Sequence, residues 1–272
     1  EEDPYDALLG YHEENLTVRK VDALTAEMKS FLIGFNREIQ KSDFRRKPVK
    51  LPPIEGSRQQ ALWKSMLSEL GFRFSAGRVD IGAHTTILAN SPADVRIVNS
   101  YHKEDIKAGI FNVLHEGGRG IYQQSISKEL LGTFLAEASS FALEEAVGRL
   151  YENVIGRNKG FWSYFHPKLK RLIPELEMAS LQDIYEDVNR LQPSLIRLDA
   201  DELTYTLHII IRYELEKDLI NGRIKVCDLP ALWNEKYEKY LGIKPTNDRE
   251  GVLQDIHWAA GYIGYFPLYF VS

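Results

Sequence analysis

The stretch His115-Glu116-Gly117-Gly118-Arg119 is the most informative part of this sequence. A zinc-peptidase helix carries two histidines four residues apart, so that both imidazoles lie on one face, with a glutamate after the first as general base. His115 and Glu116 match the start of this pattern, and Arg119 occupies the position of the second histidine. An arginine side chain stays protonated in proteins and cannot bind a metal ion. The stretch therefore predicts the helix of a metallopeptidase site that lacks one ligand.

Helical patterns lie on both sides of this stretch. Apolar residues from Val21 to Ile39 follow a three-four spacing after Thr17, which can cap a helix. Further helices are predicted over residues 57–70, 103–124, 128–156, 181–191, 199–220 and 229–240, and a proline-bearing loop over residues 47–55. The chain is thus predicted to be mainly α-helical.

The period of the apolar residues changes between residues 72 and 98. Phe72 and Phe74 alternate with a polar residue, Val79 and Ile81 are two apart, and residues 94–98 form another apolar run. Glycines and a Ser-Pro turn separate these runs, as is typical of strands joined by turns. We expect one small antiparallel sheet of two to four strands.

Composition and charge exclude several classes of protein. The net charge is −5 and no strongly basic stretch occurs, which gives no support for nucleic-acid binding. No apolar run is long enough to span a bilayer, and the first residues show no signal-peptide pattern. The single cysteine, Cys227, excludes an internal disulfide and indicates a reducing compartment. We therefore expect a cytoplasmic protein that binds neither nucleic acid nor membrane.

Several motifs along the chain occur in the order found in one known family. They are Asp94-Val95-Arg96, His115-Glu116, Glu145, Ile196-Arg197 followed by Ala200-Asp201, and the run Gly-Val-Leu-Gln-Asp-Ile-His-Trp over residues 251–258. They resemble the Asp-x-Arg-x-Thr, His-Glu-x-x-His, His-Glu-Ser, Ile-Arg-x-x-Ala-Asp and Gly-x-x-Gln-Asp-x-His-Trp motifs of the carboxypeptidase Taq family of zinc metallocarboxypeptidases. The last motif matches completely, and the likeness covers nearly all 272 residues.

The resemblance implies a mainly α-helical, zincin-like fold with the small antiparallel sheet beside the active-site cleft, formed by residues 1–272 as a single domain. Family members extend beyond both ends of this sequence, so the chain is expected to lack their N-terminal helices and C-terminal segment. The family releases C-terminal amino acids from peptides by means of zinc-activated water, which implies peptide C-termini as partners.

The resemblance also assigns roles at the site. His115 and Glu145 match zinc ligands, and Glu116 matches the general base. Arg197 and His257 match residues of the substrate cleft. Among the other polar residues, Arg96 is, with Arg197, a candidate to bind the substrate carboxylate, because the planar fork of arginine suits that group. His84 is, with His257, a candidate donor to the developing oxyanion.

The departures from the family cluster at the metal site. Arg119 replaces the second histidine ligand, and Glu144 stands where the family has the histidine of His-Glu-Ser. We expect the guanidinium of Arg119 to pair with Glu144 or Glu145 in place of a metal ion. Even an altered neighbour of a ligand lowers metal affinity ~10–100-fold, so zinc is expected to be absent or weakly bound.

Three interpretations of the function remain open. In the first, the chain is a degenerate family member with weak or no activity. In the second, it is an active carboxypeptidase with altered metal ligation, and in the third, a non-catalytic protein that binds peptides. We favour the first, because the changes affect the metal site while the other motifs persist. The apolar, aromatic end of the sequence (residues 262–271) leaves a homodimer or a complementing segment open as a further partner.

Overall fold

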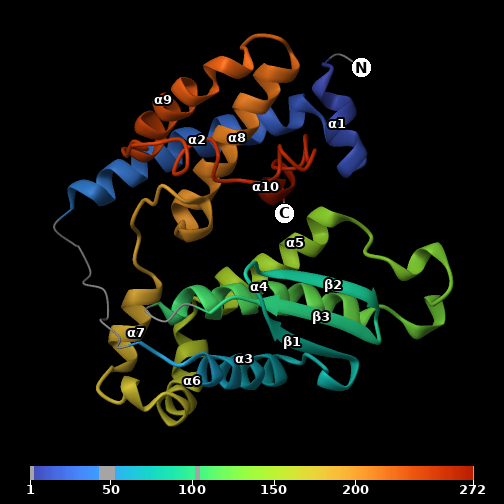
Figure 1. Cartoon of the computed structure of the whole chain (residues 1–272), viewed down its shortest axis with the longest axis vertical. Coiled ribbons are helices and arrows are strands. Elements are labelled where there is room, and N and C mark those ends of the chain that lie inside the picture. The colour runs from blue at the N-terminus through green and yellow to red at the C-terminus, as the bar shows by residue number, and fades with distance from the viewer. Residues whose placement is uncertain (1–2, 43–52, 102–104, 272) are drawn as a thin grey trace. The chain divides into compact units, whose positions relative to one another are not determined.

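The computed structural model describes residues 3–42, 53–101 and 105–271, and the chain forms two compact units (Figure 1). Unit 1 comprises residues 1–45 and 191–272, and unit 2 comprises residues 46–190. Both units are rich in helices, and unit 2 also contains a small sheet. The prediction of a mainly helical chain with one small sheet is therefore confirmed.

Unit 1 is built around α8 (Glu202–Ile220), which packs against α2 (Val18–Lys41) and α9 (Leu229–Leu241) (Figure 1). The hydroxyl of Thr17 accepts a hydrogen bond from the backbone N–H of Lys20, so Thr17 caps α2 as predicted. The core of the unit consists of fully buried side chains of α8 and α9, among them Leu207, Ile210, Ile211, Trp233 and Tyr237. The remaining elements are α1 (Tyr5–His12), η6 (Arg197–Asp199), η7 (Val226–Asp228) and α10 (Leu268–Val271).

Unit 2 is built on a three-stranded sheet that packs against α4 (Ile106–Ser125). The strand order is β1 (Gly77–Ile81), β3 (Asp94–Asn99), β2 (Thr86–Ser91). Its helical elements are α3 (Gly56–Leu70), η1 (Phe74–Ala76), η2 (Lys128–Leu130), η3 (Phe134–Ala136), α5 (Phe141–Arg149), η4 (Leu150–Ile155), α6 (Lys159–Leu172), η5 (Pro174–Leu176) and α7 (Leu181–Val188). Together the sheet, α3 and α6 enclose the core of the unit.

The sheet is mixed rather than antiparallel. β2 and β3 form an antiparallel hairpin, whereas β1 pairs with β3 in parallel, with Gly77 opposite Val95 and Ile81 opposite Asn99. Residues 82–85 carry the chain from β1 past the end of β3 to β2. Two strand spacings amount to about 10 Å, which four extended residues can cross. The prediction of an antiparallel sheet is therefore wrong for the β1–β3 pair.

Gly117 and Gly118, which follow His115 and Glu116, lie within the continuous helix α4, where other elements pack closely against them. A Cβ on Gly117 would lie 2.1 Å from Cδ2 of Leu67 on α3, and one on Gly118 would lie 2.8 Å from the ring of Tyr151 on η4. Because these residues have no side chain, α3 and η4 can approach α4 closely. The packing explains why α4 keeps residues that each cost about 1 kcal/mol of helix stability relative to alanine.

Two other local predictions are wrong, and two fall partly outside the described residues: the loop predicted over residues 47–55 and the first two residues, 103 and 104, of the helix predicted over residues 103–124. Residues 128–156 do not form a single helix, because Gly132 adopts a left-handed conformation (φ +83°) and the hydroxyls of Thr133 and Ser140 cap new turns at η3 and α5. Residues 72–74 are not a strand, since β1 begins only at Gly77. Of the predicted loop over residues 47–55, residues 47–52 lie outside the described residues.

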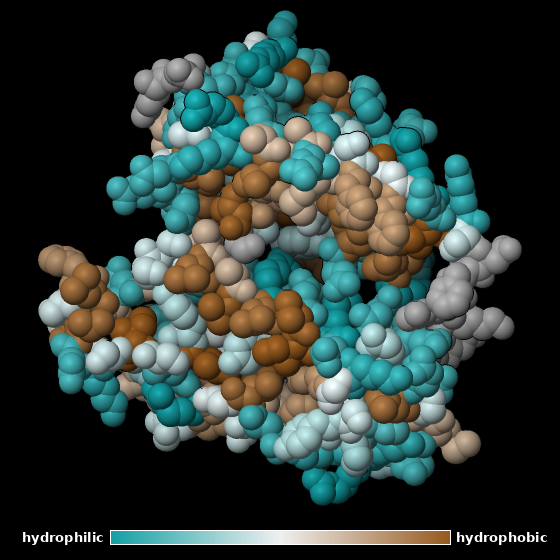
Figure 2. Space-filling view, turned by 180° about the vertical axis from the view of Figure 1, so that it is seen from behind, coloured by the Kyte–Doolittle hydropathy of each residue, from teal (hydrophilic) through white to brown (hydrophobic). Residues whose placement is uncertain are grey.

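One face of the molecule carries both hydrophilic and apolar patches (Figure 2). Figure 2 shows several groups of apolar residues between larger hydrophilic areas on one side of the molecule. Among the described residues, no helix has both the length and the hydropathy that a bilayer-spanning segment needs.

Candidate active site

Six charged side chains of unit 2 meet between α4, α5 and η4. Together they supply one histidine, one arginine and four carboxylates: His115, Glu116, Arg119, Glu144, Glu145 and Glu152. The cluster is largely buried, and Glu145 is only 1% exposed. The predicted site residues His115, Glu116 and Glu145 therefore lie together, with Arg119 among them. We call this group the Arg119 cluster.

The guanidinium of Arg119 pairs with three carboxylates. Its Nε donates to Oε1 of Glu144 at 2.9 Å, and its Nη1 donates to Oε2 of Glu116 at 3.1 Å. Nη1 also lies 3.5 Å from Oε1 of Glu145. The sequence predicted that Arg119 pairs with Glu144 or Glu145, and both ion pairs are present. The planar fork of arginine can reach both residues although their side chains leave α5 about 100° apart.

His115 lies between two carboxylates. Its Nδ1 is 2.9 Å from Oε2 of Glu152, and its Nε2 is 3.3 Å from Oε1 of Glu145. Burial disfavours the charged imidazolium, but the two carboxylates outweigh this effect and raise the pKa of His115 to about 9. With both ring nitrogens protonated at neutral pH, each donates to a carboxylate and neither has a free lone pair.

The carboxylates of the cluster differ in their pKa. Burial raises the pKa of Glu116, and the positive charges of Arg119 and His115 offset only part of this rise. Burial opposes ionisation of Glu145 and Glu152 as well, but neighbouring cations prevail at both. His115 and Arg119 lower the pKa of Glu145, and Arg149 with His115 lowers that of Glu152 to about 2. Glu145 and Glu152 therefore remain ionised at neutral pH.

The residues present do not fit a zinc ion. A structural or catalytic zinc site needs at least three protein ligands with lone pairs free for the metal. Here Oε2 of Glu145 is buried without a partner, but both ring nitrogens of His115 face carboxylates and the guanidinium of Arg119 lies where the pattern requires an imidazole. Within the described ranges, no group of three or more His, Cys, Asp or Glu side chains is arranged to hold a metal ion.

Unit 1 contains a second buried ionic network, centred on Asp255. Its Oδ1 accepts a hydrogen bond from Nε of Arg197 at 3.0 Å, and its Oδ2 accepts one from Nε of Arg212 at 2.5 Å. Oε1 of Gln254 accepts from Nη2 of Arg212 and from the backbone N–H of Arg197, both at 2.8 Å. The motifs around residues 196–201 and 251–258 thus bind each other. We call this group the Asp255 network.

His257 lies beside this network among aromatic rings. Its ring centroid is 4.6 Å from that of Phe266 and 5.7 Å from that of Tyr265. Burial lowers the pKa of His257 to about 4, and the nearby guanidinium of Arg197 adds to this effect. The imidazole is therefore neutral at pH 7. Arg197 and His257 belong to unit 1, whereas His115 belongs to unit 2. That they share one site with His115 stays a prediction.

The other two predicted substrate-binding residues lie on the sheet of unit 2. Arg96 on β3 forms a bidentate pair with Asp94. Its Nε donates a hydrogen bond to Oδ1 of Asp94 and its Nη2 donates one to Oδ2, both at 2.8 Å. The two residues are two apart on one strand, so their side chains share a face of the sheet. His84 is exposed and belongs to the connection between β1 and β2. Their predicted roles in binding a peptide stay predictions.

The sequence predicted neither Glu152 of the Arg119 cluster nor Gly148, which packs against His115. Glu152, which holds Nδ1 of His115, follows Glu145 by seven residues. Gly148 lies between them, and a Cβ there would lie 2.8 Å from the ring of His115. Gly148, three residues after Glu145 in α5, could have been found from helical spacing, whereas Glu152 lies in the π-helix η4, where that spacing does not apply.

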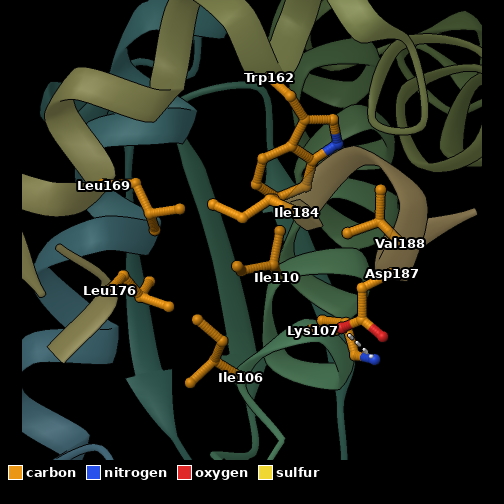
Figure 3. Close-up of a pocket in the computed structure, with 9 residues that line it drawn as sticks. All are labelled: Ile106, Lys107, Ile110, Trp162, Leu169, Leu176, Ile184, Asp187 and Val188. Atoms are coloured by element: carbon orange, nitrogen blue, oxygen red, sulfur yellow. Dashed lines mark ion pairs between the residues drawn. The ribbon is translucent and has the colours of Figure 1, made fainter. Parts of the chain in front are cut away.

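A small cavity in unit 2 shares no residue with the Arg119 cluster. It is lined by apolar side chains that include Ile106, Ile110 and Trp162, and the ion pair between Lys107 and Asp187 (2.8 Å) lies at its edge (Figure 3). Its volume of about 20 Å³ is enough for roughly one water molecule. The cavity is too small to bind a peptide.

Comparison with known proteins identifies the family. The model of the carboxypeptidase Taq (M32) metallopeptidase family matches residues 1–271. Carboxypeptidase 1 of Bacillus subtilis (strain 168) is 42% identical over 275 residues, which cover 99% of this chain and 54% of the relative. Thermostable carboxypeptidase 1 of Thermus thermophilus is also 42% identical, over 97% of this chain and 52% of the relative.

Solved structures agree with this result. An M32 carboxypeptidase from Deinococcus radiodurans R1 superposes with a TM-score of 0.95 at 32% identity, over 100% of this chain and 55% of that chain. The chain therefore spans about half the length of the relatives that it matches. It belongs to the carboxypeptidase Taq (M32) metallopeptidase family.

Proposed function

We propose that this chain is a carboxypeptidase Taq family protein in which the zinc-dependent release of C-terminal residues from peptides is lost or strongly weakened. One observation carries the proposal. The guanidinium of Arg119, four residues after His115, pairs with Glu116, Glu144 and Glu145 where the family pattern has a histidine ligand. The predicted general base, Glu116, and the predicted ligand Glu145 thereby both pair with a permanent cation.

Electrostatics opposes a metal ion at this position. An ion bound to His115 and Glu145 would lie beside Arg119, whose Nη1 is 3.5 Å from the same Glu145 oxygen. Two positive charges at such a distance repel strongly in a buried site. To bind His115, the metal would also have to displace one proton from its imidazolium, whose pKa is about 9. Both effects lower metal affinity beyond the loss of a ligand.

The predicted substrate-binding arginines already have carboxylate partners. Arg197 is only 6% exposed and pairs with Asp255, and Arg96 pairs with Asp94. A peptide carboxylate would have to compete with these aspartates. In the impaired site that we propose, Glu116 and His257 remain the candidate catalytic residues. Arg96, Arg197 and His84 remain the candidate peptide-binding residues.

The test compares the wild type with Arg119→His and with Arg119→Gln, which removes the positive charge without adding a ligand. Each protein is loaded with zinc, desalted and analysed for bound metal, and release of the C-terminal residue from an N-blocked dipeptide is followed with and without chelator. We expect substoichiometric zinc and no chelator-sensitive release from the wild type. Arg119→His should raise zinc affinity at least ~10-fold over both other proteins.

Other results would select another function. Stoichiometric zinc in the wild type, with release that a chelator abolishes, would overturn the proposal in favour of an active carboxypeptidase with altered ligation. Saturable binding of the dipeptide without turnover would indicate a peptide-binding protein. If a correctly folded Arg119→His gains no zinc affinity, the cause of the impairment lies beyond Arg119.

A further inference from the structure

Glu216 of α8 is a buried carboxylate surrounded by neutral hydrogen-bond donors. It is 2% exposed. Its oxygens accept hydrogen bonds from the hydroxyl of Tyr5 at 2.5 Å, from the backbone N–H of Gly264 at 2.5 Å and from the indole N–H of Trp258. In the described part of the chain, no lysine, arginine or histidine forms an ion pair with Glu216. Because burying a carboxylate without a cation is unfavourable, its three hydrogen bonds are its evident contribution to the structure.

Two of the three donors lie at the ends of one turn. Trp258 directly follows His257, and Gly264 directly precedes Tyr265 and Phe266. The ring centroids of these two aromatic residues lie 5.7 Å and 4.6 Å from that of His257. The carboxylate therefore holds the residue next to His257 at one end of the turn. At the other end it holds the residue that precedes the rings in contact with His257.

The third donor connects the same carboxylate to α1. Tyr5 is fully buried, and its hydroxyl shares Oε1 of Glu216 with the N–H of Gly264. Gly264 has φ +79°, and a Cβ there would lie 2.8 Å from the backbone of Leu8, so glycine allows the turn to approach α1 closely. α1 and α8 thus enclose the end of the turn that Gly264 forms.

No hydrogen bond to Nδ1 fixes the imidazole of His257. This nitrogen is buried and lies 3.9 Å from Oδ1 of Asp255, beyond hydrogen-bonding distance, and among the described residues it has no hydrogen-bond partner. Arg197 and Arg212 act on the imidazole through their charge and lower its pKa. The position of the imidazole is therefore set by the rings around it and by the backbone of the turn.

We propose that Glu216 is a positioning residue for His257. By binding Trp258 and Gly264, the carboxylate holds the turn that keeps the imidazole against the ring of Phe266. A carboxylate suits this role because both of its oxygens accept hydrogen bonds, whereas an amide would turn an NH₂ group toward an N–H donor. The functional meaning rests on the candidate role of His257 in the proposed function, but the position of the imidazole does not depend on whether unit 2 binds zinc.

The test measures the pKa of His257 in the whole chain from the histidine ring resonances in NMR spectra, with the signal assigned by its absence from His257→Gln. Glu216→Gln keeps the size of the side chain and breaks at least one of the two N–H bonds. The imidazole should become more exposed, and its pKa should rise from about 4 to ~5 or above. Loss of the carboxylate charge by itself would lower this pKa, so the direction of the change separates the two effects.

A second variant and a matched control sharpen the test. Trp258→Phe removes one donor and keeps an aromatic ring, so it should raise the pKa of His257 as well, by a smaller amount. The control is Glu214→Gln, two residues earlier on α8, whose carboxylate accepts hydrogen bonds from two lysines and from Tyr240. This change should lower stability in urea unfolding and leave the pKa of His257 as in the wild type.

Several results would overturn the proposal. They are a pKa of His257 near the ordinary 6.5 already in the wild type, an unchanged or lowered pKa in a folded Glu216→Gln, and an equal rise in Glu214→Gln, which would indicate general loosening of unit 1. If circular dichroism shows that Glu216→Gln does not fold, an unchanged pKa in Trp258→Phe would overturn it. None of these outcomes depends on zinc binding or peptide release, so they are distinct from a failure of the proposed function.

Discussion

The Arg119 cluster in unit 2 and the Asp255 network in unit 1 have opposite arrangements of charge. In the first, one guanidinium is bound by three carboxylates. In the second, one carboxylate is bound by two guanidiniums. Both are largely buried, where an ion is tolerated only when its partners are close and well oriented. Each group thus pairs its buried ions within a single unit.

The difference lies in how each group relates to the family. Arg197, Gln254 and Asp255 belong to two motifs that resemble those of the family, and these motifs bind each other. In the Arg119 cluster the central cation is itself the departure from the family pattern. In the metal-free site that we propose, Arg119 supplies positive charge among the buried carboxylates, whereas Asp255 has the cations of Arg197 and Arg212 beside it.

The largest effect is expected from Asp255→Ala. The change leaves Arg197 and Arg212 buried without their shared carboxylate, and removing one partner of a buried ion pair costs about 3–5 kcal/mol. Urea unfolding at pH 7 measures the loss. The matched control is Asp218→Ala, which breaks the surface pair with Arg223 and should cost less than about 1 kcal/mol. Equal losses for the two variants would show that the Asp255 network does not stabilise unit 1.

A somewhat smaller loss, about 2–3 kcal/mol at pH 7, is expected from Arg119→Leu. The change leaves Glu116 and Glu144 without their ion-pair partner, while Glu145 keeps His115, and the carboxylates can take up protons and so limit the cost. The loss should therefore shrink as the pH is lowered toward 4. Arg119→Lys, which keeps the positive charge, should cost less than Arg119→Leu. If Arg119→Leu is as stable as the wild type at pH 7, the guanidinium does not act as a replacement cation.

Much of the fold could be predicted from the sequence because the signals are local. Thr17 and Gly71 mark a helix start and a helix end at the predicted places. The parallel pairing of β1 with β3 could not be predicted, since it depends on which edge of the hairpin β1 reaches. Gly132 and Ser140 are residues that favour a break within residues 128–156, whereas the spacing of the apolar residues there favours a continuous helix. Tertiary packing decides which of the two preferences prevails.

The candidate site was predictable where residues are close in sequence. His115, Glu116 and Arg119 lie within one helical turn, and the charge of Arg119 alone predicts carboxylate partners. The contact between His115 and Glu152 depends on how η4, a π-helix of six residues, continues α5, and no sequence rule locates such a stretch. The distance from His115 to Arg197 or His257 depends on the placement of the two units.

Opposite pH dependence is expected for the histidines of the two groups. The pKa of His115, about 9, lies above the ordinary 6.5, so its contribution to stability is complete below pH 6.5 and is lost as the pH rises through 9. The pKa of His257, about 4, lies below 6.5, so its contribution is complete above pH 6.5 and is lost as the pH falls through 4. Each contribution should be on the order of 2 kcal/mol.

Urea unfolding between pH 4 and pH 9 tests this contrast. His115→Gln should flatten the loss of stability above pH 6.5, and His257→Gln should reduce the loss between pH 6.5 and pH 4.5, a range above the acidic titration of Glu152. Histidine ring resonances in NMR spectra report the two pKa values directly. A pKa of His115 below 7 would mean that Glu145 and Glu152 do not hold the ring as described.

The smallest effect concerns the space that Gly148 leaves for His115. In Gly148→Ala the new Cβ would lie 2.8–3.0 Å from three atoms of the imidazole, so the ring must move away from Glu145 or Glu152. Such overpacking costs about 1–2 kcal/mol, in part offset by the better helix propensity of alanine. Gly10→Ala on α1 is the matched control, because its Cβ would meet nothing within 4 Å and alanine should stabilise that helix by about 0.5–1 kcal/mol. Thermal unfolding should therefore shift in opposite directions for the two variants. A stabilised Gly148→Ala would indicate that His115 has room to move, and the ring would then not be fixed between its two carboxylates.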